Sequence, residues 1–223
     1  MDVCHESDKG SKLKSLLSNI YDQPHPGKII IFVATKKKVD ELTRFIHGFG
    51  VHVGSIHGDK SQSDRDNVLS DFRNGRSNIL VATDVAARGL DVDGIKYVIN
   101  FDFPQSSEDY IHRIGRTGRK HSTGTSYAFF TTKNAKCAKA LVDILREANQ
   151  NVNPDLEYMA RNAASIMSKE KSNNRAMNGF NNRGSGGGNR FGNSGGNYGN
   201  HRGGTGGGYG GGDRSRNFYN SRN

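Results

Sequence analysis

Cysteine is scarce in this chain of 223 residues, which holds only Cys4 and Cys137, far apart in the sequence. Two distant cysteines exclude a disulfide framework and a cysteine-rich zinc site, so a reducing compartment is expected. No long apolar run occurs, so no membrane-spanning helix is predicted. The first ten residues, MDVCHESDKG, lack an apolar segment, so a secretory signal peptide is not expected.

Charge and glycine are unevenly distributed along the chain. Residues 168–223 carry nine Lys and Arg against two Asp and Glu, a net charge of +7, whereas residues 1–167 have a net charge of +3. Seventeen of the 29 glycines also lie beyond residue 167. A basic, Gly/Asn-rich segment with few apolar residues cannot bury enough surface to offset its chain entropy. We therefore expect a globular domain over residues 9–167 and a disordered C-terminal tail over residues 168–223.

Strand and helix patterns alternate through the globular part. Short, β-branched apolar runs predict strands over residues 28–34, 51–56, 78–82, 95–101 and 125–130. Apolar residues at helical spacing predict helices over residues 11–22, 36–48, 62–74, 134–148 and 154–168. Ser61 has the character of an N-cap, and Gly75 ends the helix that follows it. The pattern indicates an α/β fold with a parallel sheet covered by helices on both faces.

The residues that follow these strands are candidates for ligand binding, because open parallel sheets bind ligands at the carboxyl ends of their strands. Thr35 follows the first strand, His57-Gly58-Asp59 the second and Thr83-Asp84 the third. A threonine there can offer its hydroxyl group and its backbone N–H to a phosphate. Gln62 and Arg65 lie three apart near the start of a helix, where backbone donors favour phosphate. The alternative for this last pair is an ordinary solvated helix face.

Two further segments contain unusual combinations of polar residues. The run from His112 to Arg119, HRIGRTGR, has three arginines and two glycines in eight residues. Guanidinium groups suit phosphate oxygens and can neutralise the charge that develops on a transferred phosphoryl group. A solvated basic loop is the alternative. The run ATDVAARGLD ends at Asp91, whose carboxylate either accepts a hydrogen bond from a ribose hydroxyl or simply belongs to a turn.

Taken together and in this order, these motifs resemble the C-terminal RecA-like domain of the DEAD-box ATP-dependent RNA helicases. The resemblance runs from about residue 9 to residue 158 and includes the blocks IIFVATKKKVDEL, IHGDKSQSDRDNVLSDFRNG and SSEDYIHRIGRTGR. The stretch LREANQNVNPDL and the Gly/Arg-rich tail are similar to the subfamily tied to nuclear RNA processing and decay. The nucleus is therefore the expected location, with the cytoplasm left open.

The resemblance implies a role for each matching residue. Arg116 and Arg119 match the arginine fingers that reach the γ-phosphate of ATP, and Asp91 matches the acid that contacts its ribose. His112 and Arg113 match residues that link this site to the contacts between the two motor domains. The positions that match the RNA-backbone face are Thr35, Gly58, Gln62, Arg65, Thr83, Arg88 and Gly89. Contacts to sugar and phosphate imply RNA binding with little sequence preference.

Other parts of such a helicase do not occur in the sequence. It contains no GxxxxGK[ST] motif and no Asp-Glu-Ala-Asp sequence. In the family, the N-terminal RecA-like domain supplies the P-loop, the Mg²⁺-binding acid and the adenine contacts. ATP with Mg²⁺ would thus be held mainly by such a domain, and no metal site is expected here. Residues 1–8 resemble the remnant of an interdomain linker. We expect a catalytically incomplete half of a helicase: a fragment, a partial gene model or a truncated product.

The tail combines arginine with spaced aromatic residues, which can stack on bases while arginine contacts phosphate. The alternative is an inert flexible linker. The six aromatic residues of the tail are Phe180, Phe191, Tyr198, Tyr209, Phe218 and Tyr219. The expected partners are RNA, an N-terminal RecA-like helicase domain and ribonucleoprotein components, without a membrane. A non-catalytic RNA-binding module is the main alternative function. A DNA helicase of the same superfamily is a third, which the HRIGRTGR and QSDR strings disfavour.

Overall fold

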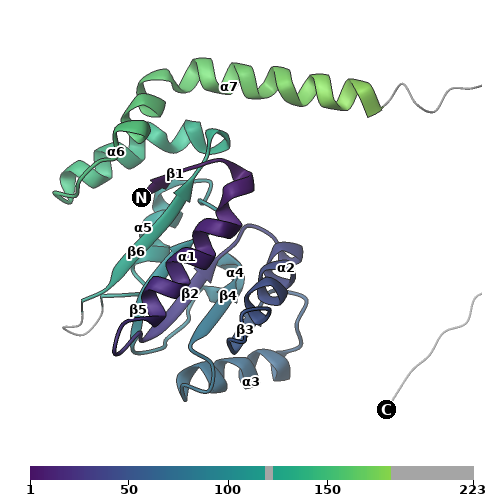
Figure 1. The fold of residues 1–223 in the computed structure, drawn as a ribbon, viewed down its shortest axis with the longest axis vertical. Coiled ribbons are helices and arrows are strands. Elements are labelled where there is room, and N and C mark those ends of the chain that lie inside the picture. The colour runs from purple at the N-terminus through teal and green to yellow at the C-terminus, as the bar shows by residue number, and fades with distance from the viewer. Residues whose placement is uncertain (119–122, 182–223) are drawn as a thin grey trace, which may run out of the picture. The chain divides into compact units, whose positions relative to one another are not determined.

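The computed structural model describes residues 1–118 and 123–181, in which strands and helices alternate (Figure 1). The strands are β1 (Asp2–Val3), β2 (Lys28–Phe32), β3 (Val53–Ile56), β4 (Ile79–Ala82), β5 (Ile95–Asn100) and β6 (Thr125–Phe130). The α-helices are α1 (Lys9–Tyr21), α2 (Lys36–His47), α3 (Gln62–Arg73), α4 (Asp84–Ala87), α5 (Ser107–Ile114), α6 (Ala138–Glu147) and α7 (Pro154–Asn181). Two 3₁₀-helices, η1 (Glu6–Asp8) and η2 (Thr132–Cys137), precede α1 and α6.

The strands form one six-stranded sheet in the order β1-β6-β5-β2-β4-β3, and all neighbouring pairs are parallel. Strand β2 lies in the interior of the sheet, where Ile29, Ile30 and Ile31 are all 0 % exposed. Its apolar sequence follows from this position, because both of its faces are covered. The predicted parallel α/β sheet is confirmed.

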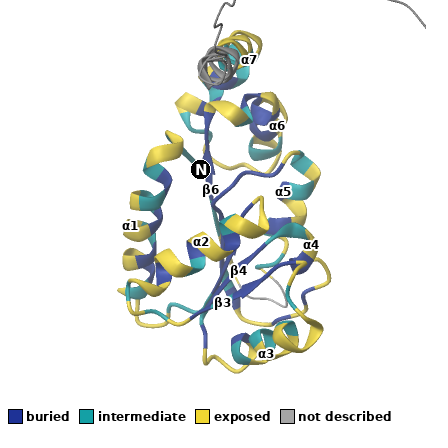
Figure 2. Cartoon of the chain, turned by 90° about the vertical axis from the view of Figure 1, so that its right-hand side faces the viewer, coloured by how far each residue is buried: buried dark blue, intermediate teal, exposed yellow. Residues whose placement is uncertain are grey.

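Helices cover both faces of the sheet (Figure 2), as the sequence predicted. On one face, α1 and α2 pack through residues such as Leu13 and Val39 against alternate side chains of β2, β4 and β5. On the other face, Phe72 of α3 and Ala86 of α4 join the intervening side chains of the same strands. A third apolar cluster holds α5, α6 and α7 against the end of β6, around Phe130.

Local signals place the helices that follow the strand ends. The side chain of Thr35 accepts a hydrogen bond from the backbone N–H of Lys38 at 3.2 Å and caps α2. Ser61 does the same for α3 by accepting from the N–H of Asp64 at 3.1 Å, which confirms the predicted cap. Gly75 follows the end of α3 with φ +74°, a conformation that favours glycine.

Several elements differ from the sequence prediction. Helices α4 and α5 lie in segments read only as motifs, although Ser106 caps α5 by accepting from the N–H of Asp109 at 3.1 Å. The two-residue strand β1 was also not expected; it is too short to carry a periodic signal. The helix predicted over 134–148 begins as η2 and continues as α6.

The last helix is longer than expected. Its predicted end near residue 168 is wrong, because α7 continues to Asn181 with a kink at Asn162. Neither glycine nor proline occurs between Pro154 and Gly179, so nothing local stops the helix, and polar composition alone does not end one. Residues 168–181 of the expected tail are thus helical, and residues 182–223 lie outside the described part.

The expected boundaries at residues 8 and 167 remain predictions. Residues 1–8, expected to resemble a linker remnant, here contribute β1 and η1, and β1 extends the sheet beside β6. Among the helices that the structure describes, none is long and apolar enough to cross a membrane.

Candidate functional site

Three of the predicted RNA-facing positions lie at the carboxyl ends of neighbouring strands. Thr35 follows β2, Thr83 follows β4 and Gly58 follows β3, and the sheet order places these strands side by side. The backbone N–H of Thr83 donates to the carbonyl of Ile56 at 3.4 Å, which joins two of the loops. Lys36, next to Thr35, forms an ion pair with Asp59, next to Gly58. The structure therefore brings these positions together along one edge of the sheet.

Gln62 and Arg65 lie in the first turn of α3, directly after the β3 loop. The amide of Gln62 is exposed and donates to Asp66 at 2.8 Å. Arg65 is half-buried, and its Nε atom is buried with no hydrogen-bond partner in the described part of the chain. A buried guanidinium nitrogen without a partner is unusual, and its N–H can only donate, for example to an anionic ligand.

Arg113 occupies the interior of the domain, where it is only 3 % exposed. Its Nε and Nη2 atoms donate to the two carboxylate oxygens of Asp84 at 2.5 and 2.7 Å. Its Nη1 atom donates to the side chain of Asn100 at 3.1 Å and to the carbonyl of Asp102 at 2.6 Å. The guanidinium group also lies 5.1 Å from the ring centroid of Phe32. Arg113 thus joins α5 to the loops after β4 and β5.

His112, the neighbour of Arg113, is exposed at the surface of the domain. His112 and Arg88, the residue that follows α4, both line a hollow of about 30 Å³. Gly89 has φ +75°, so the chain turns sharply after Arg88 in a conformation that favours glycine. The structure therefore places His112, Arg88 and Arg113 around one small depression.

Arg116 and Asp91 also come together, although they are 25 positions apart in the sequence. The Nη1 atom of Arg116 donates to the carbonyl of Leu90, the residue before Asp91, at 3.3 Å. Thr117 adds a hydrogen bond from its hydroxyl to the carbonyl of Ile95 at 2.5 Å. The loop after α5 is thereby held against residues 90–95. Arg119 lies outside the described residues.

Asp91 and Arg116 carry groups whose chemistry suits a nucleotide. An exposed carboxylate such as Asp91 can accept from ribose hydroxyls, and a guanidinium such as Arg116 can donate to phosphate oxygens. Within residues 1–118 and 123–181, no group of three or more His, Cys, Asp or Glu side chains is placed to hold a metal ion.

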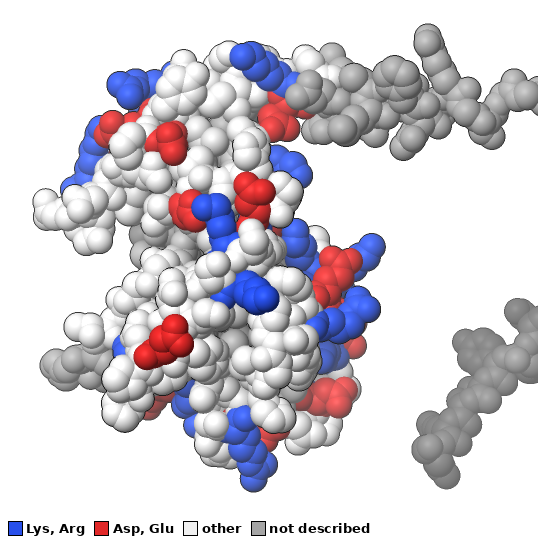
Figure 3. Space-filling model, viewed as in Figure 1, with Lys and Arg blue, Asp and Glu red and all other residues white. Residues whose placement is uncertain are grey.

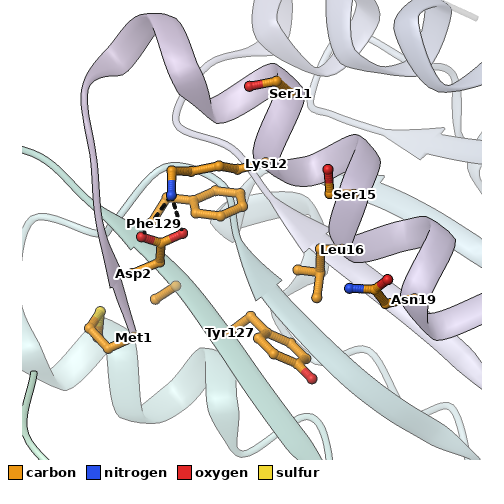
Figure 4. A pocket seen from close by; sticks show the side chains of 10 residues that line it. Met1, Asp2, Ser11, Lys12, Ser15, Leu16, Asn19, Tyr127 and Phe129 are labelled. Carbon is orange, nitrogen blue, oxygen red and sulfur yellow. Dashed lines mark hydrogen bonds and ion pairs between the residues drawn. The ribbon is translucent and has the colours of Figure 1, made fainter.

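A hollow of about 490 Å³ lies apart from these loops, between α1 and the edge of the sheet (Figure 4). Lys12 and Asp2 form an ion pair at 2.8 Å across its rim, and Leu16 and Tyr127 line its wall. None of the predicted site residues lines it. Basic and acidic side chains are interspersed on the face shown in Figure 3, in keeping with the small net charge of residues 1–167.

Sequence reasoning missed two residues that organise the site. Asp84 gives no signal in the sequence beyond its place after a strand, yet its two carboxylate oxygens accept from Nε and Nη2 of Arg113. Asp102 gave no motif signal, although it accepts from Lys9 at 3.0 Å and from the N–H of Ala34 at 3.0 Å. Its place directly after an apolar strand was the available signal, because strand ends carry the functional loops of this fold.

A parallel RecA-like sheet with arginine-bearing segments beyond its strand ends is the architecture that this chain shares with solved DEAD-box proteins. The profile of the family described as "Helicase conserved C-terminal domain" matches residues 8–121. This match spans just over half of the chain, and the chain belongs to that family.

The relatives of the chain are DEAD-box ATP-dependent RNA helicases, as the resemblance predicted. ATP-dependent RNA helicase p62 of Drosophila melanogaster is 73% identical over 164 residues, which cover 73% of this chain and 23% of the relative. The crystal structure of the yeast DEAD-box splicing factor Prp28 matches with a TM-score of 0.65 and 32% identity, over 72% of this chain and 36% of that chain.

A third comparison concerns a protein with bound ligands. Dbp5 of S. cerevisiae, bound to RNA and ADP BeF3, matches with a TM-score of 0.57 and 32% identity over 74% of this chain and 44% of that chain. The chain spans about a fifth to a third of the length of the curated relatives it matches.

Proposed function

We propose that this chain acts as the C-terminal motor half of an ATP-dependent DEAD-box RNA helicase that unwinds or remodels RNA duplexes. In this role Arg116 and Arg119 are the arginine fingers, and Asp91 contacts the ribose of ATP. The observation that carries the proposal is the hydrogen bond from Arg116 to the Leu90 carbonyl, which holds a guanidinium group beside Asp91. In the proposed role, this pair would offer a cation to phosphate and a carboxylate to ribose.

The RNA face of the proposal consists of the loops at the ends of β2, β4 and β3, together with the start of α3. The hydroxyl groups of Thr35 and Thr83 and the half-buried guanidinium group of Arg65 are donors suited to phosphate oxygens. The RNA in the Dbp5 complex supports binding of the same class of ligand here. Because such contacts position a strand without reading its bases, we expect little sequence preference.

The motor half would need a partner domain to hydrolyse ATP. The sequence contains no GxxxxGK[ST] motif, and the described residues offer no Mg²⁺ site, so ATP with Mg²⁺ would be held mainly by an N-terminal RecA-like domain. Bound Mg²⁺ would neutralise charge on the phosphates. The residues of this chain would close over the nucleotide from the other side, where Arg116 donates to the phosphate whose charge develops during transfer.

The decisive experiment joins this chain to the N-terminal helicase domain of a relative and measures RNA-stimulated ATP hydrolysis. The chain alone should show no turnover, and the joined enzyme should hydrolyse ATP. Arg116→Ala and, separately, Arg119→Ala should each lower kcat by about 10²–10⁵-fold, because each removes charge stabilisation from the transition state. Circular dichroism should be unchanged for Arg116→Ala, whose side chain is not part of the core.

Arg146→Ala is the matched control, because Arg146 forms an exposed ion pair with Glu157 at 2.7 Å between α6 and α7. It should leave kcat unchanged. Robust hydrolysis by the chain alone, or a parental kcat in either finger variant, would refute the proposal. Binding of RNA without any hydrolysis by the joined enzyme would instead favour the non-catalytic RNA-binding module. A nuclear setting with ribonucleoprotein partners belongs to the same proposal and is tested by imaging the tagged chain in cells.

A further inference from the structure

Six charged residues form a connected network from the N-terminal segment to the carboxyl edge of the sheet, in which ion pairs join the side chains and a hydrogen bond from Arg113 to the backbone carbonyl of Asp102 joins the two halves. Three are cationic and three are acidic, so their formal charges cancel. The members are Glu6, Lys9, Lys38, Asp84, Asp102 and Arg113. None of the roles proposed above accounts for the half of this network that lies on η1, α1 and α2.

Lys9 begins this network at the first residue of α1. It is only 3 % exposed, a degree of burial that lysine reaches almost only when it is paired. Its Nζ atom lies 3.0 Å from Oδ1 of Asp102 and 3.1 Å from Oε1 of Glu6, and 5.6 Å from the ring centroid of Phe101. The start of α1 and the segment before it are therefore anchored to the loop after β5.

Asp102 is the residue at which the network converges. Its carboxylate accepts from Lys9 and from the backbone N–H of Ala34 at 3.0 Å, and Lys38 lies 3.8 Å away. Its own N–H donates to the carbonyl of Phe32 at 3.2 Å. Its carbonyl accepts from Nη1 of Arg113 at 2.6 Å. The position of this carbonyl, which anchors Arg113, consequently depends on the groups that hold the carboxylate.

We propose that Lys9 and Asp102 are positioning residues that hold Arg113 and, through α5, the loop that carries Arg116. The inference rests on the proposed function, in which Arg116 acts on ATP. Arg113 lies on α5, one turn before Arg116, and its paired bonds to Asp84 fix the orientation of that helix relative to α4. The segment before α1 belongs to the same network, so its placement is coupled to the arginine-bearing loop.

The first test uses the chain by itself and observes Arg113 directly. Lys9→Met removes the buried cation, and Asp102→Asn removes the central charge while keeping the side-chain shape. In both variants, NMR should show that the Nε–H proton of Arg113 exchanges with solvent about 3- to 30-fold faster, as expected for a coupling of ordinary size. Lys12→Met is the matched control, because Lys12 lies on the same helix and pairs with Asp2 instead at 2.8 Å. It should leave the exchange rate unchanged.

The second test uses the enzyme joined to an N-terminal helicase domain. Lys9→Met and Asp102→Asn should lower kcat about 3- to 30-fold with little change in KM for ATP, because the other domain supplies most of the nucleotide contacts. The double variant should lose less than the product of the two single losses, since both act through Arg113. A purely structural defect would instead lower the fraction of active enzyme, without the reduced combined loss in the double variant.

The outcomes separate the two proposals. If the parent joined enzyme does not hydrolyse ATP, the proposed function fails, and the exchange rate of Arg113 still decides whether Lys9 and Asp102 hold it. If Lys9→Met does not fold, the isosteric Asp102→Asn decides. Parental exchange rates and parental kcat in the folded variants would overturn the positioning role.

Discussion

At the scale of single residues, the arginines of one motif have different surroundings. Arg113 is enclosed by Asp84, Asn100 and Asp102, whereas Arg116 reaches the surface beside Asp91. The resemblance places both in the active site, and only the structure separates an arginine that orients loops from one that is presented outward. A role for Arg113 in linking the site to the partner domain stays a prediction, and it would act through Asp84 and Asp102.

Arg113→Met should therefore destabilise the domain strongly. The substitution leaves the Asn100 side chain and the Asp102 carbonyl without their buried donor, at about 1–3 kcal/mol for each acceptor, and it also removes the partner of Asp84, whose side chain is 38 % exposed. Arg146→Met, which breaks the exposed pair with Glu157, should cost no more than about 1 kcal/mol. Urea denaturation followed by circular dichroism measures both, and equal small losses would contradict the interior role of Arg113.

Glu6 should make the stability of the domain depend on pH. Burial acts to raise the pKa of Glu6, but hydrogen bonds and charge attraction from Lys9 and Lys38 outweigh it, so the pKa lies below its ordinary value. A carboxylate with a lowered pKa contributes stability above its unfolded-state pKa and loses it as the pH falls through the folded-state pKa. From about pH 5 down to pH 3, Glu6→Gln should therefore lose less unfolding free energy than the parent chain. Glu147→Gln, which removes an exposed carboxylate, should follow the parent curve.

At the scale of helices and strands, the pattern of apolar residues was sufficient to predict most of the elements of the fold. Runs such as residues 28–34 have one physical explanation, a strand covered on both faces, and the sheet confirms it. The same reasoning could not find α5, because its buried positions include Arg113, which no apolar pattern marks. It also could not give the strand order, which places the loops of β2, β4 and β3 together, because pairing depends on contacts between distant segments.

Gly54 in β3 sets how closely α3 lies on the sheet. A Cβ atom there would lie 2.8 Å from Cγ1 of Val68, too close for this β-branched side chain to accept unchanged, and 3.4 Å from Cδ1 of Leu80, which is ordinary contact. Gly54→Ala should cost about 1–3 kcal/mol and shift α3, which carries Gln62 and Arg65. In Gly54→Ala/Val68→Ala the combined loss should fall short of the sum by about 0.5–3 kcal/mol, because the clash is removed.

Gly10→Ala provides the control for this prediction. A Cβ atom at this position in α1 would lie 3.7 Å from Cζ of Phe45, an ordinary contact, so the change should stabilise the helix by about 0.5–1 kcal/mol. Thermal or urea unfolding of Gly54→Ala, Val68→Ala, the double variant and Gly10→Ala tests the series. A parental unfolding free energy for Gly54→Ala would show that α3 does not depend on this contact.

At the scale of the whole molecule, RNA affinity should come mainly from the C-terminal segment. Under the proposed function, tight RNA binding by the globular part needs a second helicase domain, whereas residues 182–223 carry six arginines and one acid. If about four cationic groups engage phosphates at once, the log–log dependence of affinity on salt should have a slope near −3 for single-stranded RNA. Deleting residues 182–223, which leaves α7 intact to Asn181, should remove most binding and flatten the slope.

An aromatic variant separates charge from stacking. Replacing Phe191, Tyr198, Tyr209, Phe218 and Tyr219 with alanine should weaken binding and leave the salt slope nearly unchanged, because stacking releases few ions. Fluorescence anisotropy with a single-stranded RNA across a salt series measures both quantities. Equal affinity and slope for the truncated and complete chains would assign RNA binding to the sheet edge instead.

The pairing of β1 with β6 has a consequence for how the chain folds. Asp2 lies opposite Phe129, and the central strand β2 pairs with β5, where Ile29 lies opposite Tyr97. Contacts between such distant positions require large loops to close first, which makes folding slow for a domain of this size. During synthesis on the ribosome, Asp2 and Val3 cannot pair with β6 until β6 has emerged. Until then, the edge of the sheet is exposed to chaperones and to other nascent chains.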